Sequence, residues 1–273
     1  MRRLPVLLVA GVLALFLGTP APGAAREAPS AFDPEAAISY SQSAIGREVG
    51  DYSFLDRDRN AVRLAALRGK PLVVNLVYTA CSHTCPIIVQ TLHSAVAVAQ
   101  DALGPDSFSV VTIGFDSADD TPARMRAYAR NQGVDLPNWR FLSGDEATIA
   151  SLSEDLGFIY FPSPRGFDHL AQTTVIDADG LVYRQVYGSD FNAPAVVEPL
   201  KDLVFGRQGN LTSIDGLINR VRLFCTLYDP SSERYRFDYS IFIALAVGSV
   251  ALGAIGIILL RALLRTRRRE ERA

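Results

Sequence analysis

The chain is poor in residues that pair covalently or bind soft metals. Its 273 residues include three cysteines, three histidines and two methionines. Three cysteines cannot all form disulfides within one chain, so at least one is free, bound to a metal or joined to another molecule. Cys81 and Cys85 form a local pair, and Cys225 is the odd one. The chain also lacks internal repeats and low-complexity tracts, which excludes a repeat architecture.

An excess of basic charge is also missing. The chain has 27 basic and 29 acidic residues, and setting aside eight arginines and two glutamates at its two ends leaves 19 basic and 27 acidic ones, a net charge of −8. Nucleic acid binding needs a basic face. The charge therefore argues against nucleic acid and favours metal ions or proteins as partners.

Both ends of the chain contain apolar runs. Residues 1–25 indicate a signal peptide, because two arginines precede the apolar run from Leu4 to Leu17 and small residues follow it. An uncleaved anchor is the alternative. The twenty residues from Ile241 to Leu260 are uncharged, enough to cross a hydrocarbon core of about 30 Å. The arginines after this run place the tail in the cytoplasm and everything before Ile241 outside.

These patterns divide the chain into six segments. We expect a signal peptide at 1–25, a flexible lead at 26–50, a folded domain at 51–208, an amphipathic helix with a membrane-proximal linker at 209–240, a transmembrane helix at 241–264 and a basic cytoplasmic tail at 265–273. The amphipathic helix is predicted because apolar residues recur three and four apart between Leu211 and Leu227.

The folded domain is organised around one stretch. Leu72–Val77 is short, β-branched and apolar on both faces, which favours a central strand of a covered sheet. Pro86 suits the first turn of a following helix. Cys81 and Cys85 therefore lie at a strand-to-helix junction, where free N–H groups and the helix dipole favour thiolate over thiol. Thiolates in this position can bind a soft metal or exchange disulfides.

The remaining segments alternate between strands and helices. Further strands are expected within 51–63 and at 108–115, 138–142, 158–161, 173–176 and 182–186, with helices at 87–103, 121–132, 145–156 and 193–204. Pro199 must kink the last helix or mark its true start. This order predicts an α/β domain with a mixed sheet.

Three separated motifs together resemble one family. They are the strand followed by Cys-x-x-x-Cys-Pro and a helix, the Asp-Ser-Ala-Asp-Asp-Thr-Pro segment at 116–122, and Phe-Asp-His at 167–169 ahead of 174–180. The chain resembles the SCO/SenC family of thioredoxin-like copper proteins that assist cytochrome c oxidase assembly. The resemblance covers about residues 45–230. The ending Cys-Thr-Leu-Tyr-Asp-Pro at 225–230, followed by a membrane span, is similar to a bacterial branch.

The resemblance implies a thioredoxin-like fold with a mixed central sheet, and a copper site built from Cys81, Cys85 and His169. Soft thiolates with one imidazole select copper over hard cations. In this family such a site holds Cu(I) or Cu(II), and the apoprotein can cycle between dithiol and disulfide. The expected protein is a metallochaperone rather than a turnover enzyme. It would pass copper to the CuA centre of oxidase subunit II, from the periplasmic side of a bacterial inner membrane, with other copper chaperones as further partners.

Five other residues are polar or reactive enough to take part in such a site or to support it. His83 lies between the two cysteines and is a candidate for a fourth or transient ligand, whereas His93 is expected to be packed or solvated. Asp116 either orients a ligand or caps the next helix. Asp168 is a candidate to hold the His169 tautomer. Cys225 is expected to be a buried free cysteine, with a redox or metal relay as the alternative.

Three rival functions remain. A membrane-tethered thiol-disulfide oxidoreductase acting on subunit II would use Cys81 and Cys85 without needing His169. The absence of proline in Ala171-Gln172-Thr173 weakens this alternative, because redox-active relatives usually carry one there. A peroxiredoxin-like peroxidase lacks the expected arginine and threonine near the cysteines. An assembly scaffold without metal would tolerate loss of both cysteines.

Overall fold

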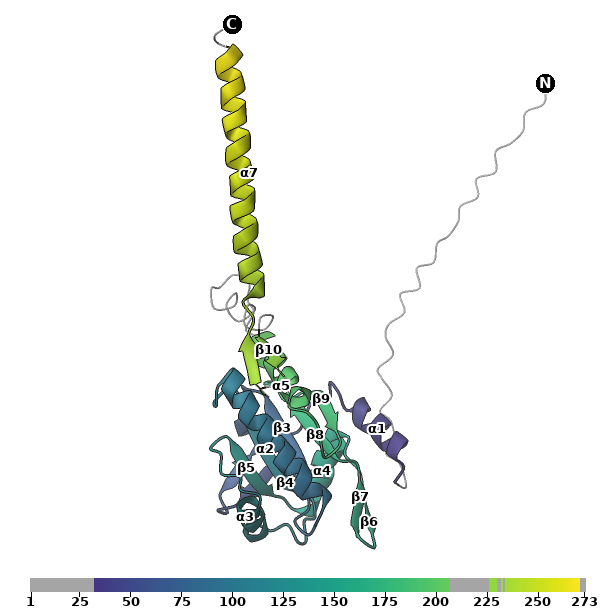
Figure 1. The fold of residues 1–273 in the computed structure, drawn as a ribbon. Coiled ribbons are helices and arrows are strands. Elements are labelled where there is room, and N and C mark those ends of the chain that lie inside the picture. The colour runs from purple at the N-terminus through teal and green to yellow at the C-terminus, as the bar shows by residue number, and fades with distance from the viewer. Residues whose placement is uncertain (1–31, 207–225, 230–231, 233, 271–273) are drawn as a thin grey trace, which may run out of the picture.

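The computed structural model describes residues 32–206, 226–229, 232 and 234–270. A seven-stranded mixed sheet forms the middle of the domain, with helices on both of its faces and a long C-terminal helix projecting away from it (Figure 1). The strand order is β2-β1-β5-β4-β3-β8-β9. The predicted α/β class and mixed sheet are confirmed.

The strands of the main sheet are β1 Ser53–Asp56, β2 Ala61–Arg63, β3 Leu72–Val77, β4 Ser109–Gly114, β5 Trp139–Ser143, β8 Gln172–Ile176 and β9 Val182–Tyr187. The helices of the domain are α1 Pro34–Ser43, α2 Thr84–Leu103, α3 Pro122–Asn131, α4 Glu146–Leu156 and α5 Pro194–Lys201, with a short helical turn η1 at Leu64–Leu67.

Strand β3 has the central position that its apolar sequence predicts. All six of its residues are buried, and it lies between β4, to which it is parallel, and β8, to which it is antiparallel. A strand without a polar face must be covered on both sides. The direction of β3 therefore determines which end of the domain receives the loop with the two cysteines.

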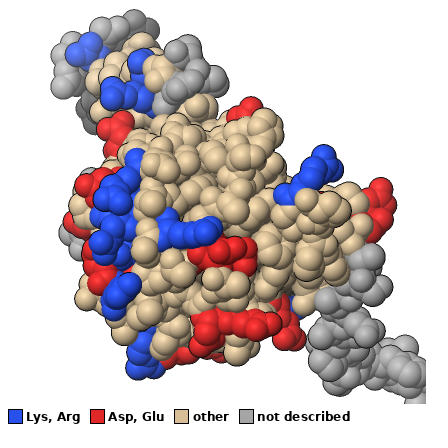
Figure 2. Space-filling model, turned by 90° about the horizontal axis from the view of Figure 1, so that it is seen from below, with Lys and Arg blue, Asp and Glu red and all other residues tan. Residues whose placement is uncertain are grey.

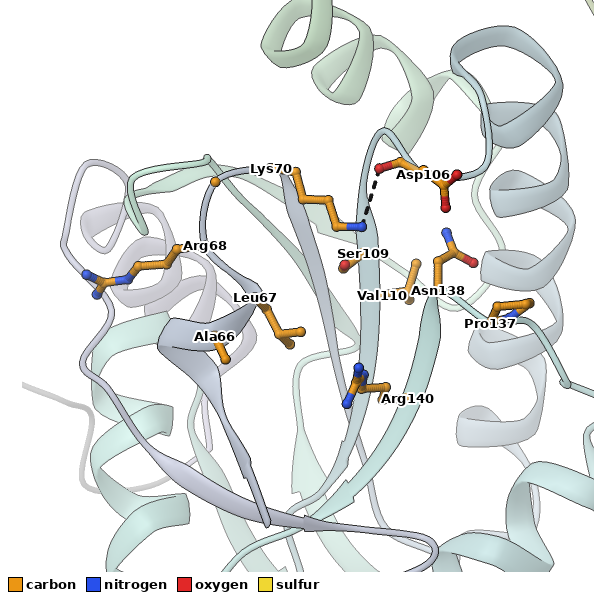
Figure 3. Close-up of a pocket in the computed structure, with 11 residues that line it drawn as sticks. Ala66, Leu67, Arg68, Lys70, Asp106, Ser109, Val110, Pro137, Asn138 and Arg140 are labelled. Carbon is orange, nitrogen blue, oxygen red and sulfur yellow. Dashed lines mark hydrogen bonds between the residues drawn. The ribbon is translucent and has the colours of Figure 1, made fainter. Parts of the chain in front are cut away.

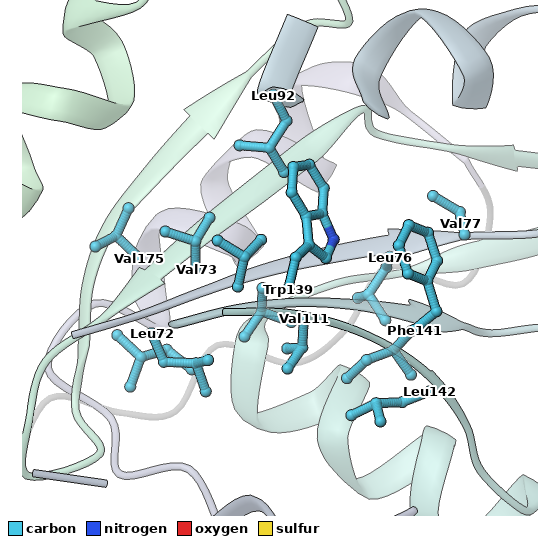
Figure 4. Close-up of a cluster of buried hydrophobic side chains, with 14 of the residues drawn as sticks. Leu72, Val73, Leu76, Val77, Leu92, Val111, Trp139, Phe141, Leu142 and Val175 are labelled. Atoms are coloured by element: carbon cyan, nitrogen blue, oxygen red, sulfur yellow. The ribbon is translucent and has the colours of Figure 1, made fainter. Parts of the chain in front are cut away.

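The hydrophobic core occupies both faces of this sheet. Successive residues of β5 point to opposite sides of the sheet, so that Trp139 lies on the side of Leu92 from α2, while Leu142 lies on the other side (Figure 4). Trp139, Leu142 and Leu92 are all buried. This double layer makes the sheet a rigid base for the loops at its ends.

Capping residues define the boundaries of α3 and α4. The Thr121 hydroxyl accepts the N–H of Arg124, and the Asp145 carboxylate accepts the N–H of Thr148, at the first turns of α3 and α4. Helix α4 ends at Gly157, which has φ +62° and so adopts the left-handed conformation that glycine favours. The helices predicted at 121–132 and 145–156 are therefore confirmed to within one residue at each end.

The prediction of a flexible lead at 26–50 is wrong for its described residues, 32–50, because α1 occupies Pro34–Ser43. Asp33 caps this helix by accepting the Ala36 N–H at 2.7 Å, and a proline starts its first turn. Its buried residues include Ala37, Tyr40 and Ser41. The helix lacks a clear sequence periodicity because only this short face packs against the domain.

The segment before β8 contains a hairpin that the sequence did not predict. Strands β6 Tyr160–Ser163 and β7 Gly166–His169 pair only with each other, as a separate two-stranded sheet that projects from the domain (Figure 1). Only a brief extended piece at 158–161 was expected. The hairpin matters because His169 is its last residue.

Pro199 neither starts nor breaks α5. The helix begins at Pro194, contains Pro199 in its interior, and continues into a π-helical turn at Asp202–Gly206. A π-helical turn is one way for a helix to accommodate a displaced backbone hydrogen bond.

The C-terminal region differs from the predicted linker. Most of the expected amphipathic helix, including Cys225, lies outside the described residues. Its predicted end at Leu227 is wrong, since Thr226–Asp229 forms β10, which pairs with β11 Arg234–Phe237. Helix α7 then runs from Ser240 to Glu270 and so includes much of the predicted tail. No residue of its segment Phe242–Leu259 is buried, and with a mean hydropathy of 2.5 this segment is long and apolar enough to cross a membrane.

Candidate metal centre

The two cysteines lie beyond the C-terminal end of β3. Cys81 follows a turn in which its N–H donates to the Tyr78 carbonyl oxygen at 3.1 Å, and Cys85 is in the first turn of α2. The Cys85 N–H donates to the Cys81 sulfur at 3.3 Å. Backbone N–H groups in a first helical turn have no partner within the helix. The Cys81 sulfur therefore takes the role of a cap at the start of α2.

The surroundings of the two sulfurs are unequal. Cys81 is half-buried, whereas Cys85 is 1% exposed. The hydrogen bond from the Cys85 side chain lowers the pKa of Cys81 well below the usual thiol value, and backbone N–H groups of Cys85 and His83 act in the same direction. The pKa of Cys85 is raised, because its proton is shared with Cys81 and its site is buried. Cys81 is therefore the thiolate of the pair.

Tyr78 links the cysteines to the β6–β7 hairpin. Its hydroxyl group hydrogen-bonds the Cys81 sulfur, and burial together with this bond raises the pKa of Tyr78 to about 12. The Tyr78 ring packs edge-on against Phe167 at 5.3 Å and against His169 at 6.1 Å between centroids. One side chain thus contacts both groups of predicted ligands.

His169 lies within an aromatic cluster. Its ring centroid is 5.3 Å from that of Phe115 and 5.6 Å from that of Phe158. Nδ1 donates to the Leu170 carbonyl oxygen at 3.0 Å, which leaves Nε2 as the nitrogen with a free lone pair. Burial lowers the pKa of His169 and so favours the neutral imidazole, the form that binds metals.

The structure brings the two cysteines into contact but does not complete a three-ligand cluster. His169 precedes β8, whose N-terminal end lies beside the C-terminal end of β3, because Thr173 pairs with Asn75. Its ring packs among aromatic side chains, and the charge of Cys81 partly offsets the effect of burial on the His169 pKa. Within the described residues, no group of three histidine, cysteine or acidic side chains is arranged to hold a metal ion.

Asp120 is a structural residue of the site that sequence reasoning missed. One carboxylate oxygen accepts both the N–H and the hydroxyl of Thr79, each at 2.7 Å, and the other accepts the Asp116 N–H at 3.0 Å. Asp120 is 2% exposed. It joins the loop before Cys81 to the loop after β4. The signal for Asp120 in the sequence is its place in the acidic motif at 116–122, directly before the cap Thr121.

The other candidate residues from the sequence lie in different surroundings. His83 is exposed, and His93 is half-buried against Trp139, with 6.1 Å between ring centroids. Asp116 contributes its backbone to the turn that leads into α3. Asp168 is exposed, and the tautomer-determining partner of His169 is Leu170 instead. The expectation that Asp168 orients the imidazole is therefore not supported by a hydrogen bond.

The surface at this end of the domain carries little basic charge near its centre. Viewed from the end opposite α7, it shows a broad uncharged area with patches of acidic side chains, while basic side chains gather mainly along one side (Figure 2). Such a surface suits a cation or an uncharged partner region better than a polyanion.

Comparisons with known proteins agree on one family. The family model described as SCO1/SenC matches residues 41–204. The SCO1 protein homolog of Bacillus subtilis (strain 168) is 26% identical over 156 residues, which cover 55% of this chain and 78% of that protein. A structure of a proposed electron transfer protein from Aquifex aeolicus is 25% identical, with a TM-score of 0.53, over 57% of this chain and 92% of that one.

Two further structures come from Sco proteins. Copper-bound ScoI of Bradyrhizobium japonicum is 26% identical, with a TM-score of 0.47, over 57% of this chain and 97% of that one. BsSco, described as having a disulfide switch and as a member of the Sco family of cytochrome c oxidase assembly proteins, is 19% identical, with a TM-score of 0.51, over 58% of this chain and 94% of that one. The similarity to BsSco supports the fold alone.

Proposed function

Because this chain belongs to the SCO1/SenC family, we propose that it binds copper through Cys81, Cys85 and His169 and delivers the metal for assembly of cytochrome c oxidase. The single observation that carries this proposal is the cysteine pair at the start of α2, with one sulfur stabilised as thiolate and a neutral imidazole nearby. Copper is the cargo, and two thiolates with one imidazole form a donor set that favours it.

The ligand set is completed by movement of the hairpin. The β6–β7 hairpin shares no strand pairing with the main sheet, and aromatic contacts of Tyr78 and Phe115 with Phe167 and His169 attach it to the domain. Contacts of this kind can rearrange without breaking a sheet. A shift of the hairpin would bring the free Nε2 of His169 toward the sulfurs when copper binds.

Delivery requires exchange of ligands with an acceptor. Cys81 is half-buried and lies between the exposed residues Ala80 and Ser82, so it can be reached by an incoming ligand, whereas Cys85 is enclosed. We expect the acceptor to be oxidase subunit II with its CuA site. Helix α7 would anchor the protein in a bacterial inner membrane, with the folded domain in the periplasm and the C-terminus in the cytoplasm.

A second function is favoured by the same pair of sulfurs. A thiolate at Cys81 beside a protonated Cys85 is the arrangement that a dithiol reductant uses, with Cys81 attacking a target disulfide and Cys85 resolving the mixed disulfide. The two electrons would come from the dithiol, which is left as a disulfide. This reaction does not require His169, so that residue separates the two functions.

The deciding experiment measures Cu(I) binding by the full chain in detergent, in competition with a chelator under anaerobic conditions. We expect near-equimolar copper in the wild type, loss of binding in C81S/C85S, and at least tenfold weaker binding in His169→Ala. His83→Ala and His93→Ala are matched controls, because they remove the other two histidines of the chain.

The outcomes distinguish the two functions. Copper binding that His169→Ala weakens while both controls retain it supports the chaperone. A wild type that takes up no copper but reduces a disulfide substrate, with His169→Ala equally active, would overturn the copper site in favour of the oxidoreductase.

A further inference from the structure

We propose that a cavity at the end of the sheet opposite the cysteines binds a phosphate group, carried by a phospholipid headgroup or by a soluble phosphate ester. The cavity has a volume of about 490 Å³ and lies between the segment joining η1 to β3 and the starts of β4 and β5. This volume falls in the range of small-molecule sites. The proposal is independent of copper binding.

Two cationic side chains enter the cavity from different elements. Lys70, just before β3, and Arg140, in β5, both point into it (Figure 3). The Lys70 ammonium group donates to the backbone carbonyl oxygen of Asp106 at 3.3 Å, which uses one of its three hydrogens. Arg140 forms no ion pair within 4 Å among the described residues, although its charge acts on the Asp56 carboxylate of the neighbouring strand β1. Both cations therefore retain donors for a ligand.

Two further charged residues, Arg68 and Asp106, line the cavity and affect its net charge. Arg68 is not counted, because it points away from the cavity, donates to the Val49 carbonyl oxygen and pairs with Glu48 at 3.4 Å (Figure 3). Asp106 is the one carboxylate of the lining and is exposed, with its side chain directed toward Asn138 (Figure 3). The cavity thus keeps a net positive charge in a domain that is acidic as a whole.

Donors that converge from several directions favour phosphate. The Ser109 hydroxyl lies in the lining, as does the Asn138 amide, whose NH2 group donates one of its two hydrogens to the Phe108 carbonyl oxygen at 3.4 Å and keeps the other. Arg and Lys together with neutral donors are the usual partners of phosphate oxygens. Pro137, which is exposed, and the small exposed part of Leu67 add apolar surface for the carbon part of a glycerol phosphate.

The position of the cavity connects it with the membrane. Strand β11 attaches at the same end of the domain, where Arg234 lies 3.8 Å from Asp101 near the end of α2, shortly before Asp106. Helix α7 begins at Ser240, directly after β11. With α7 in the bilayer, the cavity lies on the membrane-facing end of the domain, where anionic headgroups are concentrated.

The test uses the full chain in a non-ionic detergent, titrated with glycerol 3-phosphate and with short-chain phosphatidylglycerol, and with phosphatidylcholine for comparison. Binding is followed by native mass spectrometry and by the fluorescence of Trp139, the only tryptophan and the residue between Asn138 and Arg140. We expect K70E/R140E to weaken binding at least tenfold, and added salt to weaken binding to the wild type.

Matched control variants test whether the effect of charge reversal is specific to this cavity. R130E/R184E reverses two exposed cations elsewhere and should change affinity less than twofold, and K70A/R140A replaces the charge reversal if that variant fails to fold. Binding of the lipid or of the ester alone identifies the source of the phosphate. The proposal is overturned if neither ligand binds, or if K70E/R140E binds as tightly as wild type. Copper loading should be equal in all variants, which separates this site from the copper site.

Discussion

Cys81 and Cys85 carry the same side chain four residues apart, yet their surroundings make them different acids. The Cys81 sulfur accepts hydrogen bonds from the Cys85 side chain, from backbone N–H groups and from Tyr78, while Cys85 is buried beneath it. A thiolate is both the better nucleophile and the better ligand for soft metal. The asymmetry therefore assigns the first contact with copper or with a disulfide to Cys81.

This asymmetry predicts how Cys81 reacts as pH falls. Because its pKa is lowered, Cys81 stays a thiolate, and its alkylation by iodoacetamide should change little between about pH 8 and pH 6, where an ordinary thiol with pKa about 8.5 slows about tenfold per unit. Peptide mapping by mass spectrometry after timed alkylation measures the rate at Cys81.

The matched variants for this prediction are C85A and C85S. Alanine removes the side-chain donor that contributes most to the lowered pKa, so the reactivity of Cys81 should become strongly pH-dependent, whereas serine keeps a donor and should preserve more of the plateau. Identical profiles for wild type and C85A would show that Cys85 does not stabilise the thiolate.

Asp120 is the second residue whose role depends on its surroundings. We expect Asp120→Ala to lower the free energy of unfolding by about 2–4 kcal/mol, because it leaves the Thr79 and Asp116 N–H donors buried without partners. Asp120→Asn retains an acceptor and should cost less. Urea unfolding followed by circular dichroism measures both, and an Ala variant as stable as the Asn variant would contradict the assigned role.

The pH dependence of this effect has a defined sign. Burial raises the pKa of Asp120 above its ordinary value, so the group contributes stability at low pH that is lost as pH rises through the raised pKa. The stability of the wild type relative to Asp120→Asn should therefore fall as pH rises from the ordinary carboxyl pKa to the raised pKa of Asp120, and be constant at higher pH. The difference between the two proteins isolates Asp120 from other carboxylates.

At the scale of elements, the β6–β7 hairpin is the part of the site with the fewest constraints. Main-chain pairing holds β3, β4 and β8 together, but side-chain contacts hold the hairpin, and Tyr78 is the residue that contacts both Cys81 and the hairpin. Gly166 at its turn has φ +116°, and a Cβ there would lie 2.7 Å from the Tyr78 hydroxyl oxygen. The close approach of Tyr78 to the hairpin therefore depends on this glycine.

Gly166→Ala should loosen the hairpin and weaken copper binding. Gly188→Ala is the matched control, since Gly188 also has a positive φ, +92°, but nothing within 4 Å of an added Cβ. Both variants lose about 1 kcal/mol of stability from the backbone conformation, and Gly166→Ala should lose about 1–3 kcal/mol more by displacing Tyr78.

Thermal unfolding and hydrogen exchange at residues 160–169 measure these effects. Faster exchange of the hairpin in Gly166→Ala than in Gly188→Ala is the expected result. Equal exchange in both would mean that the contact with Tyr78 does not hold the hairpin in place.

At the scale of the whole molecule, one rigid domain is joined through the β10–β11 hairpin to a single long helix. Tyr235 of β11 donates to Glu198 of α5 at 2.7 Å, and α2 also contacts β11. These contacts set the end of the domain that faces α7. The proposed copper site lies at the far end, where a partner can reach it without approaching the bilayer.

The predicted topology can be tested with reporter fusions. Green fluorescent protein fused after Ala273 should fluoresce, and alkaline phosphatase fused after Gly206 should be active, because the first folds in the cytoplasm and the second needs export. Replacing Arg265, Arg267, Arg268 and Arg269 by glutamine should reduce the fluorescent fraction, since tail charge sets the orientation. A fluorescent fusion after Gly206 would contradict an exported domain.

The sequence by itself determined the features that depend on neighbouring residues. Strand β3 follows from a short β-branched run, the starts of α3 and α4 from Thr121 and Asp145, and α7 from an uninterrupted apolar segment. The pairing of Cys81 with Cys85 and the thiolate character of Cys81 follow from spacing and from a helix start, whereas the thiolate expected at Cys85 is wrong, because burial and the shared proton raise its pKa. These signals are local, so tertiary structure had little scope to override them.

Only the tertiary structure decided which distant segments meet. It placed α1 against the domain, paired β6 with β7, buried Asp120 between two loops and directed Lys70 and Arg140 into one cavity. It also made Cys81 and Cys85 unequal and put His169 among aromatic rings. Each of these outcomes depends on packing and burial between residues far apart in the chain, and periodicity and spacing along the sequence carry no information about such contacts.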